Sequence, residues 1–173
     1  TAIIMTDVVS YLTPDEALGR QLLPVARRVF SDTFSRRYDA APFVQFLDET
    51  YRIDGSMHQD LRNSAVRWRV AVVNDIPVGY AKLTPLRAPA PDPLPGSLEL
   101  QQLYVVSEWQ GRGVAQHLTD WALDQTKKVH ASEIYLTVFG DNERAKRFYA
   151  RNQFEEVGRC TFQLGDRVDD DRI

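Results

Sequence analysis

Two glycines on either side of an arginine, Gly111-Arg112-Gly113, are the residues whose types and spacing most directly suggest chemistry. An apolar, strand-like run over 97–106 precedes them, and an amphipathic helical pattern over 114–129 follows. Glycine has no Cβ, so the backbone can adopt positive φ and a ligand can approach it closely. The first N–H groups of the helix lack intrahelical partners and lie at the positive end of its dipole. The sequence therefore predicts a phosphate or diphosphate site here, with Arg112 as a further cation, unless the segment is only a strand-to-helix turn.

Two better-known phosphate motifs do not describe this turn. No Gly-Lys-Ser or Gly-Lys-Thr follows it, as a nucleotide-binding P-loop requires. The third glycine of dinucleotide-binding folds is absent, and no βαβ pattern precedes the turn. A P-loop is therefore excluded, and a dinucleotide-binding fold is a poor match.

Metal and thiol chemistry find little support in the sequence. The three histidines, His58, His117 and His130, lack the spacing of metal ligands, so no metal site is predicted. Cys160 is the only cysteine, and its neighbours suggest a strand, so we expect it to pack rather than to act as a nucleophile. No internal disulfide can form, which fits a reducing cytoplasm.

Composition indicates one globular domain over 1–173. The chain is 43% hydrophobic and 26% charged, which is enough apolar material for a full core. Its net charge of −3 argues against a nucleic-acid partner. No apolar run reaches membrane-spanning length and no signal peptide is evident, so we expect no membrane partner and a cytoplasmic location. The oligomeric state, with a homodimer as one alternative, and the completeness of both ends stay open.

The predicted elements alternate around the glycine turn. Helix signals include Thr13 as a cap, and Pro24 is expected to kink or break the first helix. The pair Asn74-Asp75 predicts an antiparallel hairpin. The proline-rich run 87–96 predicts a loop between two strands, or alternatively a lid over a substrate. The remaining helices are predicted at 14–35, 42–51, near 56–59 and at 142–152, and the remaining strands at 3–11, 66–73, 76–83, 132–139 and 154–164.

Two motifs give the chain a family resemblance. Gln110-x-x-Gly113-x-Ala115 after an apolar strand resembles the signature of the GNAT superfamily of acyl-CoA-dependent N-acetyltransferases. A second block, Asn142-x-x-Ala145-x-x-Phe148-Tyr149, follows at the order and distance that the family shows. Two further segments look closest to its small-amine and polyamine-acetylating branch: Phe30-x-Asp32-Thr33-Phe34 and Phe162-x-Leu164-Gly165-Asp166.

The resemblance implies acetyl-CoA as cosubstrate, without a metal, and a set of residues to hold it. The glycine turn would bind the diphosphate, and backbone groups of Leu103 and Val105 would receive the thioester and pantetheine arm. A bulge near Gln101 and Gln102 would open that strand, as bulges do beside active sites. The implied coenzyme-binding residues are Leu103, Tyr104, Val105, Gln110, Gly111, Arg112, Gly113, Val114, Ala115, Asn142 and Ala145.

Two residues are predicted to be catalytic on the same resemblance. An alkyl amine with a pKa near 10.4 is almost entirely protonated at neutral pH, so a base is expected. Glu99 is the candidate base, from its distance before Gln110; alternatively it faces solvent or pairs with an arginine. Tyr149 is the candidate acid for the departing thiolate, because it occupies the family's motif tyrosine; alternatively it is a packed helix residue.

The expected fold and function follow from these motifs. The fold is α/β (α+β): a mixed, mostly antiparallel six- to seven-stranded sheet with helices on both faces, splayed between the strands at 97–106 and 132–139. The function is direct acetylation of a primary amine of a small molecule. The acidic tail with Asp48, Glu49 and Asp54 favours a cationic acceptor such as a polyamine. A protein N-terminus or lysine as acceptor, and a catalytically silent acyl-CoA-binding module, are the alternatives.

Overall fold

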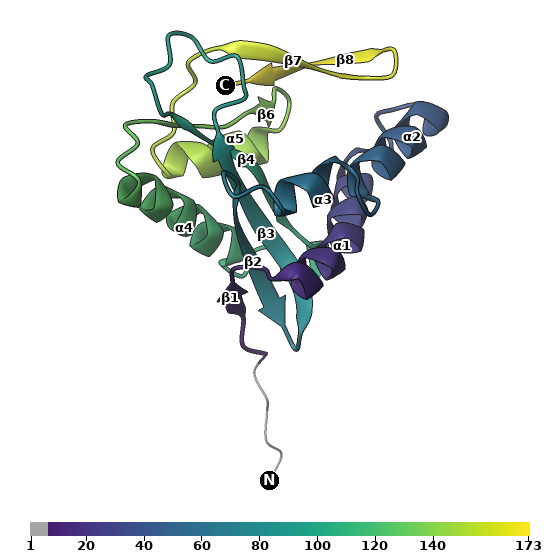
Figure 1. The fold of residues 1–173 in the computed structure, drawn as a ribbon. Coiled ribbons are helices and arrows are strands. Elements are labelled where there is room, and N and C mark those ends of the chain that lie inside the picture. Colours follow the sequence, from purple (N-terminus) through teal and green to yellow (C-terminus); the bar gives the residue numbers. More distant parts are fainter. Residues whose placement is uncertain (1–6) are drawn as a thin grey trace.

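A twisted five-stranded sheet forms the centre of the computed structural model, which describes residues 7–173 (Figure 1). Its strands run in the order β1-β2-β3-β4-β5, and every neighbouring pair is antiparallel except β4 with β5. The bounds are β1 Ser10–Leu12, β2 Arg67–Val73, β3 Ile76–Pro85, β4 Leu98–Val105 and β5 Ile134–Tyr135. The expected mixed, mostly antiparallel sheet is confirmed, but within 7–173 it has five strands rather than the six to seven predicted.

A second, three-stranded sheet takes the C-terminal strands, in the order β6-β8-β7. These are β6 Val138–Phe139, β7 Arg159–Leu164 and β8 Arg167–Arg172. The sheet is separate because the strand predicted at 132–139 is interrupted: β5 pairs with β4, whereas β6 pairs with β8. The acidic segment after Gly165, for which no strand was predicted, forms β8.

Helices cover both faces of the central sheet, as expected (Figure 1). On one face lie α1 Glu16–Phe34, α2 Ala40–Tyr51 and α3 Ser56–Leu61, and on the other α4 Val114–Lys128. Alternation along β2 explains this: Trp68, Val70 and Val72 pack toward α1–α3, whereas Ala71 and Val73 pack toward α4. The fifth helix, α5 Glu143–Arg151, packs Tyr149 against the α4 side.

The predicted N-cap of α1 was wrong, and of the two outcomes expected at Pro24, a kink or a break, the break does not occur. The N-cap is Asp15 rather than Thr13, and its carboxylate accepts the Leu18 N–H at 2.8 Å. Pro24 lies inside an unbroken helix. A proline there costs about 3 kcal/mol, but its ring is exposed, while Leu22 and Ala26 on the opposite side are fully buried and hold the helix to the sheet. Packing therefore overrides the local preference.

Other local predictions fit the structure in part, although the strand predicted at 154–164 begins only at Arg159 and Gly55, not Ser56, caps the third helix. Asn74 and Asp75 both have positive φ, 48° and 63°, which suits the two-residue turn of the β2–β3 hairpin. The proline-rich segment 87–96 has no regular structure. The short third helix begins at Ser56 after a Gly55 cap that makes no side-chain hydrogen bond. Part of the first predicted strand, 3–6, lies outside the described residues.

Candidate active site

The glycine turn presents unused hydrogen-bond donors. Gly111 and Gly113 have φ of 73° and 84°, the positive values that the sequence predicts. No backbone amide from 111 to 116 donates a hydrogen bond of ordinary geometry to another residue within 7–173; the first to do so is that of His117, to the Gly113 carbonyl. A Cβ built on either glycine meets nothing within 4 Å. Unpaired backbone N–H groups, the positive end of the helix dipole and open space therefore lie together at the start of α4. This combination suits an anionic ligand.

Two of the predicted coenzyme-binding side chains also have internal contacts. The Gln110 amide donates to the Val105 carbonyl at 3.1 Å and accepts from Arg144 on α5 at 3.3 Å. The Asn142 side-chain carbonyl accepts the Ala145 N–H at 3.1 Å and so caps α5. These contacts hold the turn and α5 in place, and the Asn142 side-chain NH₂ has no hydrogen-bond acceptor among residues 7–173.

The predicted splay begins where β4 leaves β5. Only Leu98 with Ile134 and Glu99 with Tyr135 are paired. Gln101 is an extra residue between the pairs Lys82–Gln102 and Leu83–Leu100, which confirms the expected bulge. Because the Val106 amide donates to Val78 on β3, strand alternation turns the amides of Leu103 and Val105 the other way, into the split.

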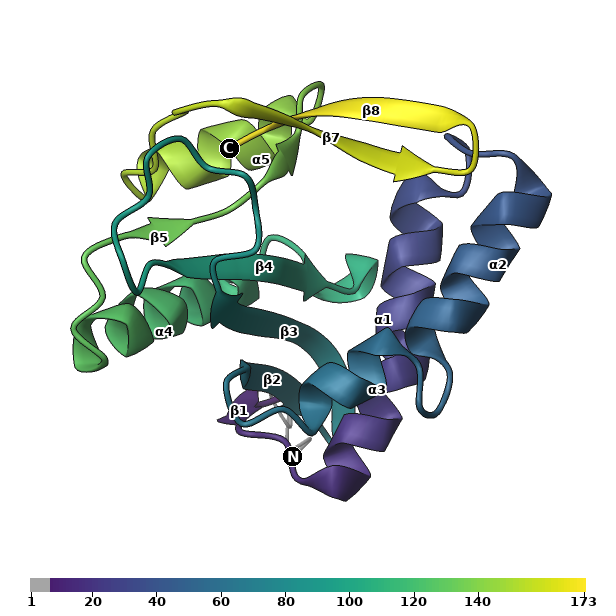
Figure 2. The ribbon, with the colours of Figure 1, turned by 45° about the horizontal axis from the view of Figure 1, so that its top comes forward.

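A cavity of about 440 Å³ lies over this stretch of β4. Gln101, Gln102 and Tyr104 form its floor, and Thr137 marks where it reaches the split. Helices α1–α3 form one wall and the small sheet forms the roof; in Figure 2 the β7–β8 hairpin spans from the side of α5 to α2. The aromatic lining residues are Phe30, Phe34, Tyr38, Phe46, Tyr51, Tyr104, Phe139 and Phe162.

The roof is fixed to the helical wall at three points. Asp169 on β8 accepts hydrogen bonds from Tyr38 and from Arg37, the latter at 2.8 Å. The Phe162 ring meets Phe46 edge-on with centroids 6.1 Å apart. At the hairpin turn, Gly165 lies against Pro42 so closely that an added Cβ would come within 2.8 Å of it. The cavity is therefore enclosed by built contacts between distant parts of the chain.

A buried ion cluster forms one end of the cavity. Lys82, 4% exposed, donates to Asp60, which Arg87 also contacts through both terminal nitrogens at 2.9 and 3.0 Å. Burial opposes ionisation of Asp60, but the hydrogen bonds from Arg87 and Lys82 outweigh it and lower its pKa. Burial lowers the pKa of Lys82, and Asp60 opposes that shift. The three side chains carry two positive charges and one negative charge, and the Glu99 charge also acts on both cations.

Glu99, the predicted base, lines this cavity and is 4% exposed. Its Oε2 atom accepts the backbone N–H groups of Arg87 and Ala88, both at 2.8 Å. The carboxylate thus anchors the start of the proline-rich loop, and Oε1 is the oxygen without a described partner. Neither expected alternative, solvent exposure or pairing with an arginine side chain, describes this arrangement.

Tyr149, the predicted acid, packs between Phe148 and Phe154, with ring centroids 5.3 and 5.7 Å away. It lines a second cavity of about 710 Å³ between α4, β5 and α5, not the aromatic cavity that Glu99 lines. Burial raises the pKa of Tyr149 well above its usual range, and the nearby Tyr104 raises it further. Its hydroxyl donates no hydrogen bond to a residue within 7–173. Tyr104, whose own pKa burial raises to about 12, lines the aromatic cavity.

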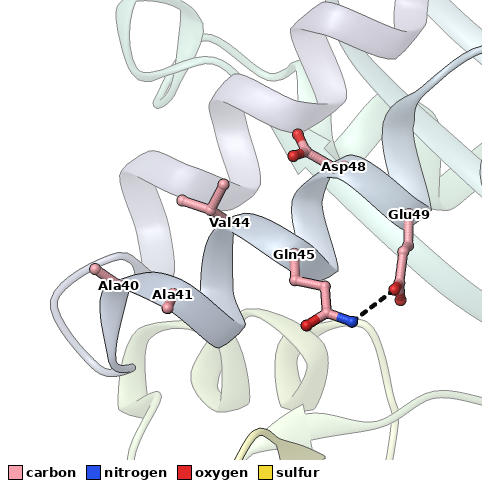
Figure 3. A pocket seen from close by; sticks show the side chains of 6 residues that line it. All are labelled: Ala40, Ala41, Val44, Gln45, Asp48 and Glu49. Carbon is pink, nitrogen blue, oxygen red and sulfur yellow. Dashed lines mark hydrogen bonds between the residues drawn. The ribbon is translucent and has the colours of Figure 1, made fainter.

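Three acids predicted to attract a cation do not line the aromatic cavity. Asp48 pairs with Arg27, and Asp54 pairs with Arg62 on the surface. Figure 3 shows a shallow hollow on the outer face of α2, lined by Ala40, Ala41, Val44, Gln45, Asp48 and Glu49, where Gln45 donates to Glu49 at 2.9 Å. Since all six belong to one helix surface, this hollow is separate from the predicted site.

Sequence reasoning missed the individual acids of β8 that line the cavity. Asp169 and Asp171 both lie there, from the tail that was noted only as acidic. The signal was available: Gly165-Asp166 is a turn pair, and alternation after it places residues 169 and 171 on one face. Within 7–173, no group of three or more His, Cys, Asp or Glu side chains is arranged to hold a metal ion, and no helix is long and apolar enough to cross a membrane.

Comparison with known proteins agrees with this geometry. The model of the acetyltransferase (GNAT) family matches residues 27–154. An uncharacterised N-acetyltransferase in the pepI 3′ region of Lactobacillus delbrueckii subsp. lactis is 26% identical over 146 residues, 84% of each chain. PaiA N-acetyltransferase from Thermoplasma acidophilum, solved with coenzyme A, superposes with a TM-score of 0.71 at 18% identity, covering 95% of this chain and 98% of that one. Aminoglycoside N-acetyltransferase AAC(6′)-Iy, also solved with coenzyme A, gives 0.66 at 13% identity, covering 96% and 100%.

Proposed function

Because the chain belongs to the acetyltransferase (GNAT) family, we propose that it transfers the acetyl group of acetyl-CoA directly to a primary amine of a small molecule. One observation carries this proposal. The enclosed aromatic cavity reaches the split beside β4, and unpaired amides at the start of α4 follow the same strand.

The donor half of the site is proposed to use backbone groups. The amides from 111 to 116 bind the diphosphate, with Arg112 on the rim. The amides of Leu103 and Val105 face the split, where they bind the pantetheine arm and hold the thioester oxygen as negative charge develops. The Asn142 side-chain NH₂ is the further donor. Acetyl-CoA supplies the activated acyl group that an amine can attack.

Two side chains are proposed to handle protons. Tyr149 holds its proton at neutral pH, as a phenol with a pKa near 10 or above does, and its hydroxyl, without a described partner, is available to donate to the departing sulfur. Glu99 remains the base that the family resemblance indicates, acting through Oε1 because Oε2 already accepts two backbone N–H groups. No acyl-enzyme is formed, and Cys160 takes no part.

The enclosure of the cavity supports a small acceptor over a protein terminus. The β7–β8 hairpin contacts α2 and the residues after α1, so it covers the cavity on that side and narrows the space for an extended peptide. The AAC(6′)-Iy neighbour is named for an aminoglycoside acceptor, which is also a small amine. Four carboxylates line the cavity: Asp60, Glu99, Asp169 and Asp171. Cations pair with Asp60 and with Asp169, so Asp171, which is unpaired within 7–173, is the charge that favours a cationic acceptor such as a polyamine.

An amine panel tests this function. Free thiol released from acetyl-CoA is followed with spermidine, spermine, putrescine, 2-phenylethylamine, an aminoglycoside and a peptide with a free N-terminus. We expect release with one or more small amines and little with the peptide. Faster release with the peptide would give a protein acetyltransferase. Coenzyme binding without release from any amine would give a catalytically silent binding module.

A further inference from the structure

One carboxylate in the aromatic cavity has no partner among residues 7–173. Asp60 is held by two cations, Glu99 accepts two backbone amides, and Asp169 accepts from Tyr38 and two arginines. Asp171, by contrast, makes no hydrogen bond or ion pair with any described residue. Its carboxylate is therefore the one negative charge of the cavity lining that the described part of the chain leaves uncommitted.

The position of Asp171 suits contact with a bound ligand. It pairs across the small sheet with Cys160 on β7 and with Phe139 on β6, so its side chain shares the roof face with Asp169. Phe139, Phe162 and Tyr104 line the same cavity. The Asp171 charge also raises the pKa of Tyr104 on the floor. Aromatic faces beside a free carboxylate form a suitable environment for an ammonium group.

We propose that Asp171 binds the ammonium group of the acceptor amine and takes up its proton. The binding half stands on the geometry alone, whereas the proton transfer rests on the proposed acetyltransferase function. The Asp171 carboxylate first takes one proton from the ammonium group, which frees the nitrogen lone pair. As the amine nitrogen attacks the thioester carbonyl carbon, the new C–N bond forms and the C–S bond breaks. The nitrogen gives its second proton to Oε1 of Glu99, which lines the same cavity, and the departing sulfur receives the proton that Tyr149 holds. The Tyr149 phenolate regains a proton from solvent before the next turnover.

The surroundings of Asp171 favour this role. Burial raises its pKa, Asp169 and Asp170 raise it further, and Arg37 and Arg172 oppose the shift. A carboxylate with a raised pKa takes up a proton more readily than an ordinary one. The titratable and charged groups around it are Asp169, Asp170 and Arg172 on β8, Arg37 after α1, Tyr104 on β4 and Cys160 on β7.

A binding experiment tests the proposal without turnover. Calorimetry compares 2-phenylethylamine with its neutral counterpart 2-phenylethanol, on protein saturated with coenzyme A. A charge-assisted hydrogen bond contributes about 1.5–3 kcal/mol, so the wild type should bind the cation at least about tenfold more tightly. Asp171→Asn and Asp171→Ser should remove this preference. Asp170→Asn, one residue away on the exposed side and paired with Arg172, should retain it.

A kinetic experiment then separates the two candidate bases. With the fastest amine of the panel, Asp171→Asn should lower kcat/KM about hundredfold or more, the scale of general-base catalysis, while coenzyme affinity stays unchanged. The acidic limb of the kcat/KM pH profile should also disappear. A cation preference that persists in Asp171→Asn, or wild-type kinetics in Asp171→Asn with the loss found in Glu99→Gln, would overturn the proposal. If the wild type releases no thiol with any amine, the acetyltransferase function is rejected instead. The calorimetry alone then decides whether Asp171 binds the ammonium group.

Discussion

The substitution Gly113→Ala offers the sharpest separation of fold from coenzyme binding. Gly113 caps α4 at φ 84°, and an added Cβ would touch no protein atom within 4 Å. Any alanine penalty for the fold is therefore a backbone penalty, about 1–2 kcal/mol for an L-residue held in the left-handed region. In a domain of this size, that corresponds to a melting temperature lower by about 2–4 °C for each kcal/mol.

Coenzyme affinity should fall by more than this penalty explains. Either the methyl group protrudes where the diphosphate must approach, or the peptide rotates and turns an amide donor away. A hydrogen bond to a charged group contributes about 1.5–3 kcal/mol, so the Kd for coenzyme A should rise about tenfold to about hundredfold. Calorimetry with coenzyme A measures the affinity, and differential scanning calorimetry measures the stability.

The chain offers a matched control in Gly96. It has φ 78°, and an added Cβ there likewise meets nothing within 4 Å, but it lies in the proline-rich loop away from α4. Gly96→Ala should cost similar stability and leave the Kd unchanged. If both variants bind coenzyme A equally well, the glycine turn is a structural feature only and the reasoning is wrong.

Three further substitutions follow from the same contacts. Tyr149→Phe removes a hydroxyl that has no described partner, so the stability of the fold and the affinity for coenzyme A should stay unchanged. The value of kcat should fall about hundredfold or more, and an unchanged kcat in single-turnover assays would remove Tyr149 from the mechanism. Gly165→Ala places a Cβ within 2.8 Å of Pro42 and should raise KM for the amine by loosening the roof, whereas KM equal to that of Gly96→Ala would show the roof to be irrelevant. Asp60→Asn leaves Lys82 buried without its charged partner and should cost about 3–5 kcal/mol in denaturant unfolding, against less than about 1 kcal/mol for the exposed Asp54→Asn. Because the folded-state pKa of Asp60 is lowered, its pairing stabilises the fold above the usual aspartate pKa near 3.9, and that stability is lost as pH falls through the lower folded value; an equally steep acid limb in Asp60→Asn would contradict this.

The sequence predicts the elements that local chemistry determines. The glycine turn and the Asn74–Asp75 hairpin lie where residue type alone restricts the backbone, whereas the bulge at Gln101 was predicted from the family resemblance. Predictions were less accurate where tertiary packing opposes the local preference of a residue. Pro24 was expected to kink or break α1, but the helix is continuous, and buried residues on the opposite side hold it to the sheet.

The walls of the site were harder to predict because they form between distant segments. Asp169 meets Tyr38 and Arg37 across more than 130 residues, and no local pattern encodes that contact. Glu99 was rightly placed before the glycine turn, but its bond to the amides of Arg87 and Ala88 depends on the course of a loop without regular structure. Asp48 and Asp54 were predicted to attract a cationic acceptor, but they pair with arginines and do not line the cavity. A count of acidic residues does not show where their side chains point.

The central claim is that the amides at the start of α4 bind the coenzyme diphosphate. A ¹⁵N-labelled sample titrated with coenzyme A tests it most directly through the backbone amide signals. The account predicts large shifts for residues 111–116, with smaller ones at Leu103 and Val105. Signals from 111–116 that stay in place while coenzyme A saturates the protein would contradict it.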